Sequence, residues 1–136
     1  MSQVVVDRNS SGAKTTGKAM NIILWVLQIG AAGMFLMAGF AKLAGAEPAV
    51  AMFNTIGLGQ WFRYLTGALE VISAVMLLIP RLSGVGALLL IGVMIGAVIT
   101  HLFVIGGNPV GAIVLLVVSV IIAWGRRDRT LRLLGR

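Results

Sequence analysis

Four long runs of apolar residues, separated by short polar stretches, form the main pattern of this chain. They cover about residues 21–41, 62–79, 82–105 and 109–125. Each approaches or reaches the roughly 20 residues that an α-helix needs to cross the hydrocarbon core of a bilayer, with the second and fourth on the short side. The pattern predicts an all-α fold: a polytopic membrane protein whose four transmembrane helices form a compact bundle.

The composition supports a membrane location. Apolar residues make up 59% of the 136 positions, whereas soluble domains are only about half apolar. The excess must face lipid or partners, so we expect the bilayer itself, a membrane protein partner or a second copy of the chain to cover it. The first apolar run is longer than the roughly 7–15 residues of a cleaved signal peptide, and we expect it to be retained.

Basic residues are distributed unevenly about the predicted spans. The chain has eleven Lys and Arg against four Asp and Glu. Only Lys42 and Arg63 fall on one side of the spans. Cytoplasmic loops of membrane proteins carry the excess of Lys and Arg, so both termini are predicted to be cytoplasmic. Basic flanks of this kind indicate no nucleic-acid partner. The residues on the other side are Arg8, Lys14, Lys18, Arg81, Arg126, Arg127, Arg129, Arg132 and Arg136.

The polar stretches divide the chain into three parts. Residues 1–20 are predicted to be a flexible basic segment, residues 21–125 the membrane domain, and residues 126–136 a basic cytoplasmic tail. Between the first two spans, Glu47-Pro48 is typical of a helix start. Two interpretations of this connection stay open: a short interfacial helix on the outer membrane surface, or an ordinary structured loop.

Glu70 interrupts an otherwise apolar span, in the stretch TGALEV. It lies seven residues beyond Arg63, about 10 Å deeper along a helix. Spacings of three, four and seven residues place Thr66 on the same helix face. A charged side chain at a helix centre costs about 2.5–3.5 kcal/mol in a bilayer. We therefore expect Glu70 to face the bundle interior and to find a partner there.

Polar residues of two other spans fall at a similar depth, and together they predict one polar pocket in the outer half of the bundle. Each has an alternative role. Lys42 and Arg63 could reach the headgroups, Glu70 could form a purely structural ion pair, and Gln28 a hydrogen bond between helices. His101 alone is more typical of a structural hydrogen bond. The candidate ligand-binding or proton-relay residues are Glu70, Lys42, Arg63, His101, Thr66, Thr100 and Gln28.

Several chemistries are excluded or unsupported by the sequence. The chain has no cysteine, which excludes disulfides, thiol redox chemistry and iron–sulfur clusters. It has no phosphate-binding glycine loop, nucleophile elbow or paired-histidine metal motif, so no metal site is predicted. A haem held by His101 and one methionine stays formally open. Gly92 and Gly96 form a small-xxx-small pattern that predicts close helix packing, by default within the bundle.

Three stretches resemble a known family. They are FLMAGFAKL ending the first span, RYLTGALEVISAVMLLIP in the second and GAVITHL ending the third. They are similar to the DoxX and DoxX-like family of small four-helix bacterial membrane proteins. The resemblance covers roughly Trp25 to Trp124. It implies a compact four-helix bundle in the bacterial inner membrane, somewhat like vitamin K epoxide reductase-type proteins, although those use cysteines.

The resemblance limits the function without fixing it. The family takes its name from a subunit associated with a thiosulfate:quinone oxidoreductase, and other members are linked to redox and oxidative-stress assemblies. We therefore expect a redox-linked accessory subunit that binds a quinone or another small lipophile, with standalone catalysis disfavoured. The resemblance makes quinone a candidate cofactor and fixes none. Two alternatives stay open: a structural or assembly subunit without its own ligand, and a small proton-coupled transporter.

Overall fold

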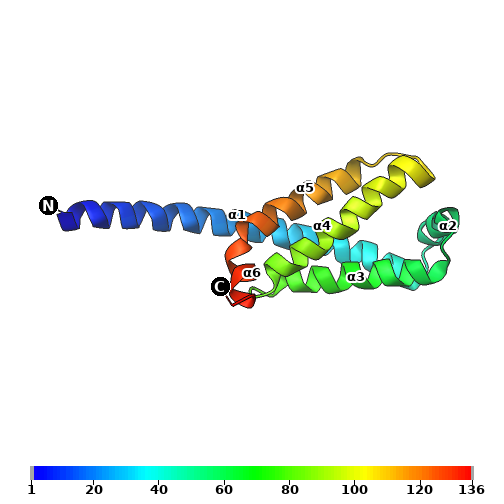
Figure 1. The fold of residues 1–136 in the computed structure, drawn as a ribbon, viewed down its shortest axis with the longest axis horizontal. Coiled ribbons are helices and arrows are strands. Elements are labelled where there is room, and N and C mark those ends of the chain that lie inside the picture. Colours follow the sequence, from blue (N-terminus) through cyan, green and yellow to red (C-terminus); the bar gives the residue numbers. More distant parts are fainter. Residues whose placement is uncertain (1, 136) are drawn as a thin grey trace.

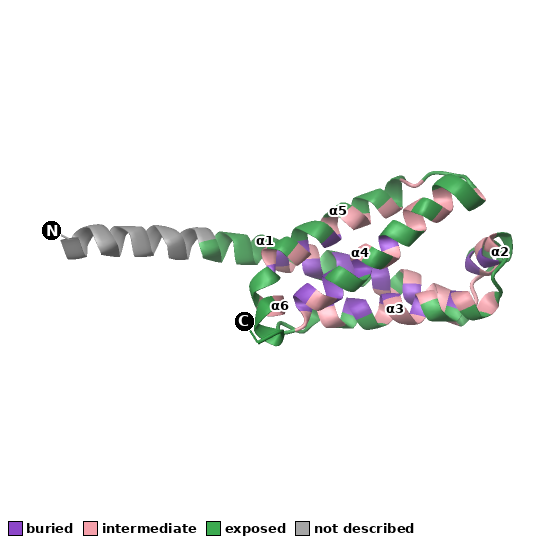
Figure 2. Ribbon diagram, viewed as in Figure 1, coloured by how far each residue is buried: buried purple, intermediate pink, exposed green. Residues whose placement is uncertain are grey.

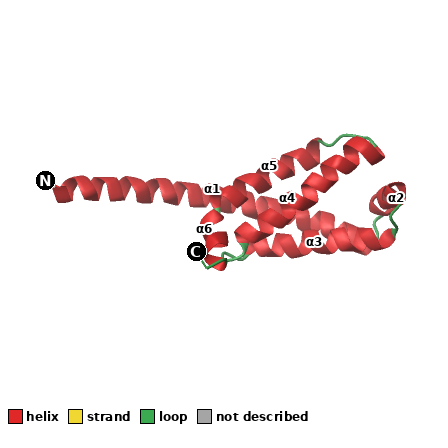
Figure 3. Ribbon diagram, in the orientation of Figure 1, coloured by secondary structure: helices red, strands yellow, loops and turns green. Residues whose placement is uncertain are grey.

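The computed structural model describes residues 2–135, with side chains from residue 17 onward. No strand occurs among residues 2–135, and helices joined by short loops account for nearly all of them (Figure 3), which confirms the all-α prediction. The elements are α1 (Ser2–Ala44), α2 (Glu47–Ile56), α3 (Gln60–Leu78), α4 (Ser83–Thr100), the π-helix η1 (His101–Ile105), α5 (Val110–Gly125) and α6 (Arg127–Leu133).

The long helices run up and down as a bundle (Figure 1). α1 packs along α3, α3 against α4, α4 against α5, and α5 returns to α1. The part of α1 from Gly17, α3, and α4 continued by η1 are each long and apolar enough to cross a membrane; α5 qualifies only together with α6, which bends away by 62°. We call the end of the bundle that carries α2 and η1 the α2 end, and the opposite end the α6 end.

Burial follows the pattern of a protein surrounded by lipid. Buried residues concentrate where α1, α3 and α4 pack together, while the outward faces are exposed (Figure 2). Those outward faces carry large apolar side chains, which an aqueous surface would not tolerate in such density. The described part of the chain is therefore a polytopic helical membrane protein. Examples of the exposed side chains are Ile29, Met37, Ile72, Leu88, Phe103 and Val117.

Glycines bring α1 and α3 into backbone contact. A Cβ added to Gly39 would lie 2.9 Å from the carbonyl oxygen of Gly67 and 2.6 Å from Cγ2 of Val71. The predicted close packing of Gly92 and Gly96 within the bundle is wrong, because a Cβ on either one would meet no atom within 4 Å. A small-xxx-small spacing marks one face of a helix but does not say what that face meets.

The connection between the first two spans is a helix, so the loop alternative is wrong. α2 begins at Glu47 with Pro48 in its first turn and ends at Gly57, whose φ of 83° is the left-handed conformation that favours glycine. Ala49 and Phe53 are buried. The position of α2 on a membrane surface stays a prediction.

The two chain ends differ from simple flanking tails. α1 has no break at residue 20, and its side chains are described only from Gly17, so the flexibility of residues 1–20 stays a prediction. At the other end, the sequence predicts only a basic tail for residues 126–136, yet α6 folds back against α4. A Cβ on Gly84 would lie 2.9 Å from the carbonyl oxygen of Arg126 and 2.0 Å from Oγ1 of Thr130, so the missing side chain of Gly84 makes this approach possible.

Candidate functional site

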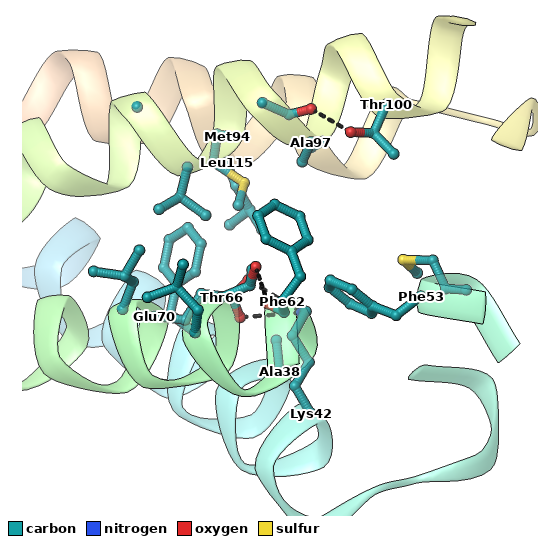
Figure 4. A pocket seen from close by; sticks show the side chains of 18 of the residues that line it. Ala38, Lys42, Phe53, Phe62, Thr66, Glu70, Met94, Ala97, Thr100 and Leu115 are labelled. Carbon is teal, nitrogen blue, oxygen red and sulfur yellow. Dashed lines mark hydrogen bonds and ion pairs between the residues drawn. The ribbon is translucent and has the colours of Figure 1, made fainter. Parts of the chain in front are cut away.

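A partly open cavity of about 550 Å³ lies at the α2 end, lined by residues of α1, α2, α3, α4, η1 and α5 (Figure 4). This volume lies within the roughly 300–1,000 Å³ of typical small-molecule sites. The α4–α5 hairpin diverges from the α1–α3 pair toward this end (Figure 1). Most of the lining is apolar and includes Phe35, Phe53, Phe62, Met94, Ala97 and Leu115.

Lys42 and Glu70 form an ion pair in the wall of this cavity. Nζ of Lys42 lies 3.1 Å from Oε1 and 3.2 Å from Oε2 of Glu70. The side chain of Glu70 is 3% exposed and that of Lys42 is 17% exposed. The sequence-based expectation that a helix-borne carboxylate would face inward and find a partner describes this geometry well. The pair is the only salt bridge among the residues whose side chains are described.

The glycine contact between α1 and α3 positions the ion pair. Gly39 and Gly67 each lie three residues before a member of the pair, Lys42 and Glu70. A Cβ on Gly67 would lie 2.9 Å from Cβ of Lys42. Because the two backbones touch at this level, the Lys42 ammonium can bond both oxygens of the carboxylate.

Arg63 is buried nearby, but its hydrogen bonds go to Gln60 and to the C-terminal end of α1. Its Nε donates to Oε1 of Gln60 at 2.6 Å, Nη1 donates to the backbone carbonyl of Lys42, and its guanidinium lies 4.3 Å from the ring centre of Tyr64. A cation at the last carbonyls of a helix stabilises the helix dipole. Arg63 does not line the cavity. The structure therefore brings Arg63 to Lys42, but not to Glu70.

Three predicted residues line the cavity without joining the ion pair. Thr66 Oγ1 donates to the carbonyl of Phe62 at 2.9 Å, and Thr100 Oγ1 donates to that of Gly96 at 2.7 Å. Nδ1 of His101 lies 2.8 Å from the carbonyl oxygen of Ala97. His101 also begins the π-helix η1, a type of distortion that is frequent at functional sites. Because a carbonyl oxygen can only accept, Nδ1–H of His101 is the donor to Ala97, and Nε2 has no hydrogen bond to the described residues.

Gln28 lies apart from the other candidates. It stands fourteen residues before Lys42 on α1, about 21 Å away along the helix. Its Nε2 donates to the carbonyl of Leu77 at 2.7 Å, and its Oε1 accepts from Nε of Arg126 at 2.6 Å. Among the roles considered from the sequence, the hydrogen bond between helices matches this position.

Sequence reasoning missed the aromatic cover of the cavity. Phe53 of α2 is 3% exposed, and its ring centre lies 5.7 Å from that of Phe62 on α3. Both side chains line the cavity, and in Figure 4 the ring of Phe53 points from α2 toward Phe62. The apolar face of α2 was visible in the sequence, but not the surface on which it packs.

The arrangement suits recognition of a lipophile with a polar head. An ammonium donor and a carboxylate lie at one wall of an otherwise apolar cavity, a combination that orients a ligand through a few polar contacts and retains it through apolar burial. The described side chains include no group of three His, Asp or Glu that could hold a metal ion. The fold and the charged pair thus favour ligand binding.

A comparison with protein families gives one match. The model described as "DoxX-like family" matches residues 26–125, which include α3, α4, η1, α5 and most of the membrane part of α1. No curated protein and no solved structure gives a significant match.

Proposed function

We propose, from the premise that this chain belongs to the DoxX-like family, that it is a redox-linked accessory subunit that binds a quinone in the cavity at the α2 end. Another small lipophile with a hydrogen-bonding head would satisfy the same site. One observation carries the proposal: the Lys42–Glu70 ion pair lies in the wall of an apolar cavity of about 550 Å³.

Different lining residues would contact different parts of a bound quinone. A quinone head offers two carbonyl oxygens, which need hydrogen-bond donors. Lys42 would donate to one of these oxygens, while Nε2 of His101, whose Nδ1–H is directed at the carbonyl of Ala97, would accept from a hydroxyl of the reduced form, and Phe35 and Phe62 would contact the ring. When a partner subunit reduces the quinone, the product also takes up protons, and Glu70 is placed to pass one.

The proposal includes a location and an orientation. We place the protein in the inner membrane of a bacterium, with the α6 end in the cytoplasm, because the positive-inside rule puts the excess of Lys and Arg there. The cavity then lies in the periplasmic half of the bilayer. The electron donor or acceptor would be a membrane protein partner docked on the exposed apolar faces.

The transport alternative is disfavoured by the packing beyond the cavity. A proton-coupled transporter needs a polar path to both ends. Between the cavity and the α6 end, most buried side chains of the described core are apolar, among them Ala32, Leu77 and Leu90. The buried polar side chains there include Ser73, Ser119 and Gln28, none of which carries an acid or base group that could hold a transported proton. The assembly alternative predicts a partner but no ligand, and the same experiment separates it from quinone binding.

The test is titration of the purified full chain in neutral detergent with a short-chain ubiquinone, read as a shift in thermal unfolding. We expect stabilisation of the wild type, none for Ala97→Phe, which fills the cavity, and at least about tenfold weaker binding for Glu70→Gln. Glu47→Gln and Ala19→Phe, both at exposed positions, are the matched controls and should bind as the wild type does.

Two results would reject the proposal. If the wild type shows no shift, the cavity takes no quinone, and a stoichiometric partner that copurifies with both wild type and Glu70→Gln would favour the assembly role. If Ala97→Phe retains the full shift, the quinone binds elsewhere.

A further inference from the structure

A second hollow, of about 330 Å³, lies at the α6 end, where the turn between α3 and α4 meets α6. Its walls are Pro80 and Arg81 of the turn with Arg129, Arg132 and Leu133 of the C-terminal segment. It is far from the cavity described above and shares no residue with it. Three arginines around one small hollow give it a strongly positive character.

No carboxylate neutralises these arginines within the described part of the chain. The only salt bridge recorded there joins Lys42 to Glu70 at the other end of the bundle. Asp128, the nearest acidic residue in the sequence, forms no ion pair with them and does not line the hollow. An anion bound here would therefore meet three guanidinium groups that form no ion pair within the described residues.

One of the arginines is already held in place. Nη1 of Arg129 donates to the carbonyl of Pro80 at 2.9 Å and lies 3.3 Å from Oγ of Ser83. The structure records no bond within residues 17–135 to its Nε or Nη2. Arginine binds phosphate well because its planar fork presents parallel N–H donors. A guanidinium that lines a hollow and is held at one nitrogen is preorganised for such a ligand.

The position of α6 indicates where the anion comes from. α6 bends 62° from the axis of α5 and lies at the end of the bundle that carries the turn between α3 and α4. Leu131 of α6 and Leu134, the residue that follows this helix, are 43% and 71% exposed, and Leu133 lines the hollow. A basic hollow at the end of the spans can contact a lipid headgroup, and the apolar side chains beside it can contact the acyl chains.

We propose that this hollow binds the phosphate of an anionic phospholipid, held by Arg81, Arg129 and Arg132. The volume of about 330 Å³ suits a headgroup, while the acyl chains stay in the bilayer. The bound lipid would hold α6 against the turn between α3 and α4, at the α6 end of the bundle. Free phosphate shares the chemistry of the headgroup but lacks the chains.

The test is a titration of the purified full chain in neutral detergent with short-chain phosphatidylglycerol, with short-chain phosphatidylcholine and with inorganic phosphate. Thermal stability and native mass spectrometry report binding. The double variant Arg81→Gln/Arg132→Gln removes two exposed arginines with no recorded hydrogen bond, so it should fold normally. The control Lys18→Gln/Arg127→Gln removes the same charge from exposed residues outside the hollow.

We expect phosphatidylglycerol to bind and stabilise the wild type and the control. The test variant should bind it about thirtyfold more weakly, because each surface arginine contributes about a fivefold factor toward anionic lipid. Equal losses in the two double variants would overturn the site, since they would indicate general charge attraction. Equal binding of phosphatidylcholine would overturn it as well. Stabilisation by inorganic phosphate alone, with none by phosphatidylglycerol, would overturn the lipid as the ligand.

Discussion

Nε of Arg126 donates to Oε1 of Gln28 at 2.6 Å, which joins two residues 98 positions apart in the sequence. Gln28 in turn donates to the carbonyl of Leu77, and Nη1 of Arg126 donates to Oδ1 of Asn21 at 2.8 Å. Gln28 is fully buried, and Arg126 is 5% exposed. This network connects α1 to α3 and to the bend between α5 and α6, so it holds the α6 end of the bundle together.

Loss of the Gln28 amide should destabilise the fold strongly. Gln28→Leu leaves a buried guanidinium N–H and the carbonyl of Leu77 without partners, and we expect a loss of about 2–4 kcal/mol in the free energy of unfolding. Gln28→Glu keeps the acceptor for Arg126 and should lose less. Reversible unfolding in mixed micelles measures both. A change below about 0.5 kcal/mol for Gln28→Leu would contradict a structural role for the network.

The ion pair at the cavity should behave as a coupled unit. Glu70→Gln or Lys42→Met alone leaves a poorly hydrated charge without its partner, and each should cost about 3 kcal/mol of unfolding free energy. The double variant Lys42→Met/Glu70→Gln should cost clearly less than the sum, since no unpaired charge remains. A double-mutant cycle in micelles gives the coupling energy. Additive losses would show that the two charges do not stabilise each other.

The spans and the inward glutamate could be predicted because the free-energy terms that decide them are strong and do not depend on how the helices pack. Long apolar runs have no stable place in water, and a carboxylate in a bilayer must find a partner. Glu70 has few possible partners at its depth, and Lys42 is one of them. These constraints depend on composition and on position along a helix, which a sequence displays directly.

Arg126, Arg63 and the glycine contacts could not be placed in the same way. A basic residue after the last span looks the same whether it is solvated or, like Arg126, packed against Gln28. The spacing of Gly92 and Gly96 resembles a packing motif, yet Gly39 and Gly67, on different helices, make the close approach. Which faces meet depends on how helices rotate and cross, and a single sequence does not contain that information.

The contact of α1 with α3 should be sensitive to one added methyl group. Gly39→Ala places a Cβ 2.6 Å from the side chain of Val71 and 2.9 Å from a backbone oxygen. The helices must separate, and we expect a loss of about 1–3 kcal/mol in stability and a weakened Lys42–Glu70 pair. Gly33→Ala is the matched control on α1, because a Cβ there meets nothing within 4 Å. Similar thermal unfolding of the two variants would argue against backbone contact at Gly39.

Helix α2 should control access to the cavity. The chain contains no cysteine, so Ala97→Cys introduces a single thiol at the cavity wall. Phe53 is 3% exposed and packs on Phe62, and both line the cavity. Phe53→Ala removes this packing, which holds α2 in the position seen in the structure. A loss of about 1.4 kcal/mol in that packing free energy raises the population in which α2 has moved away about tenfold.

We therefore expect the thiol of Ala97→Cys to react with a water-soluble maleimide about tenfold faster when Phe53→Ala is added, because a low-stability cover opens more often. Phe103→Ala, on η1 with a side chain that is 80% exposed, is the control and should leave the rate unchanged. Mass spectrometry of timed samples gives both rates. Equal acceleration by the two substitutions would mean that the thiol is reached by general loosening of the α2 end, and an unchanged rate with Phe53→Ala would mean that reagents enter by another route.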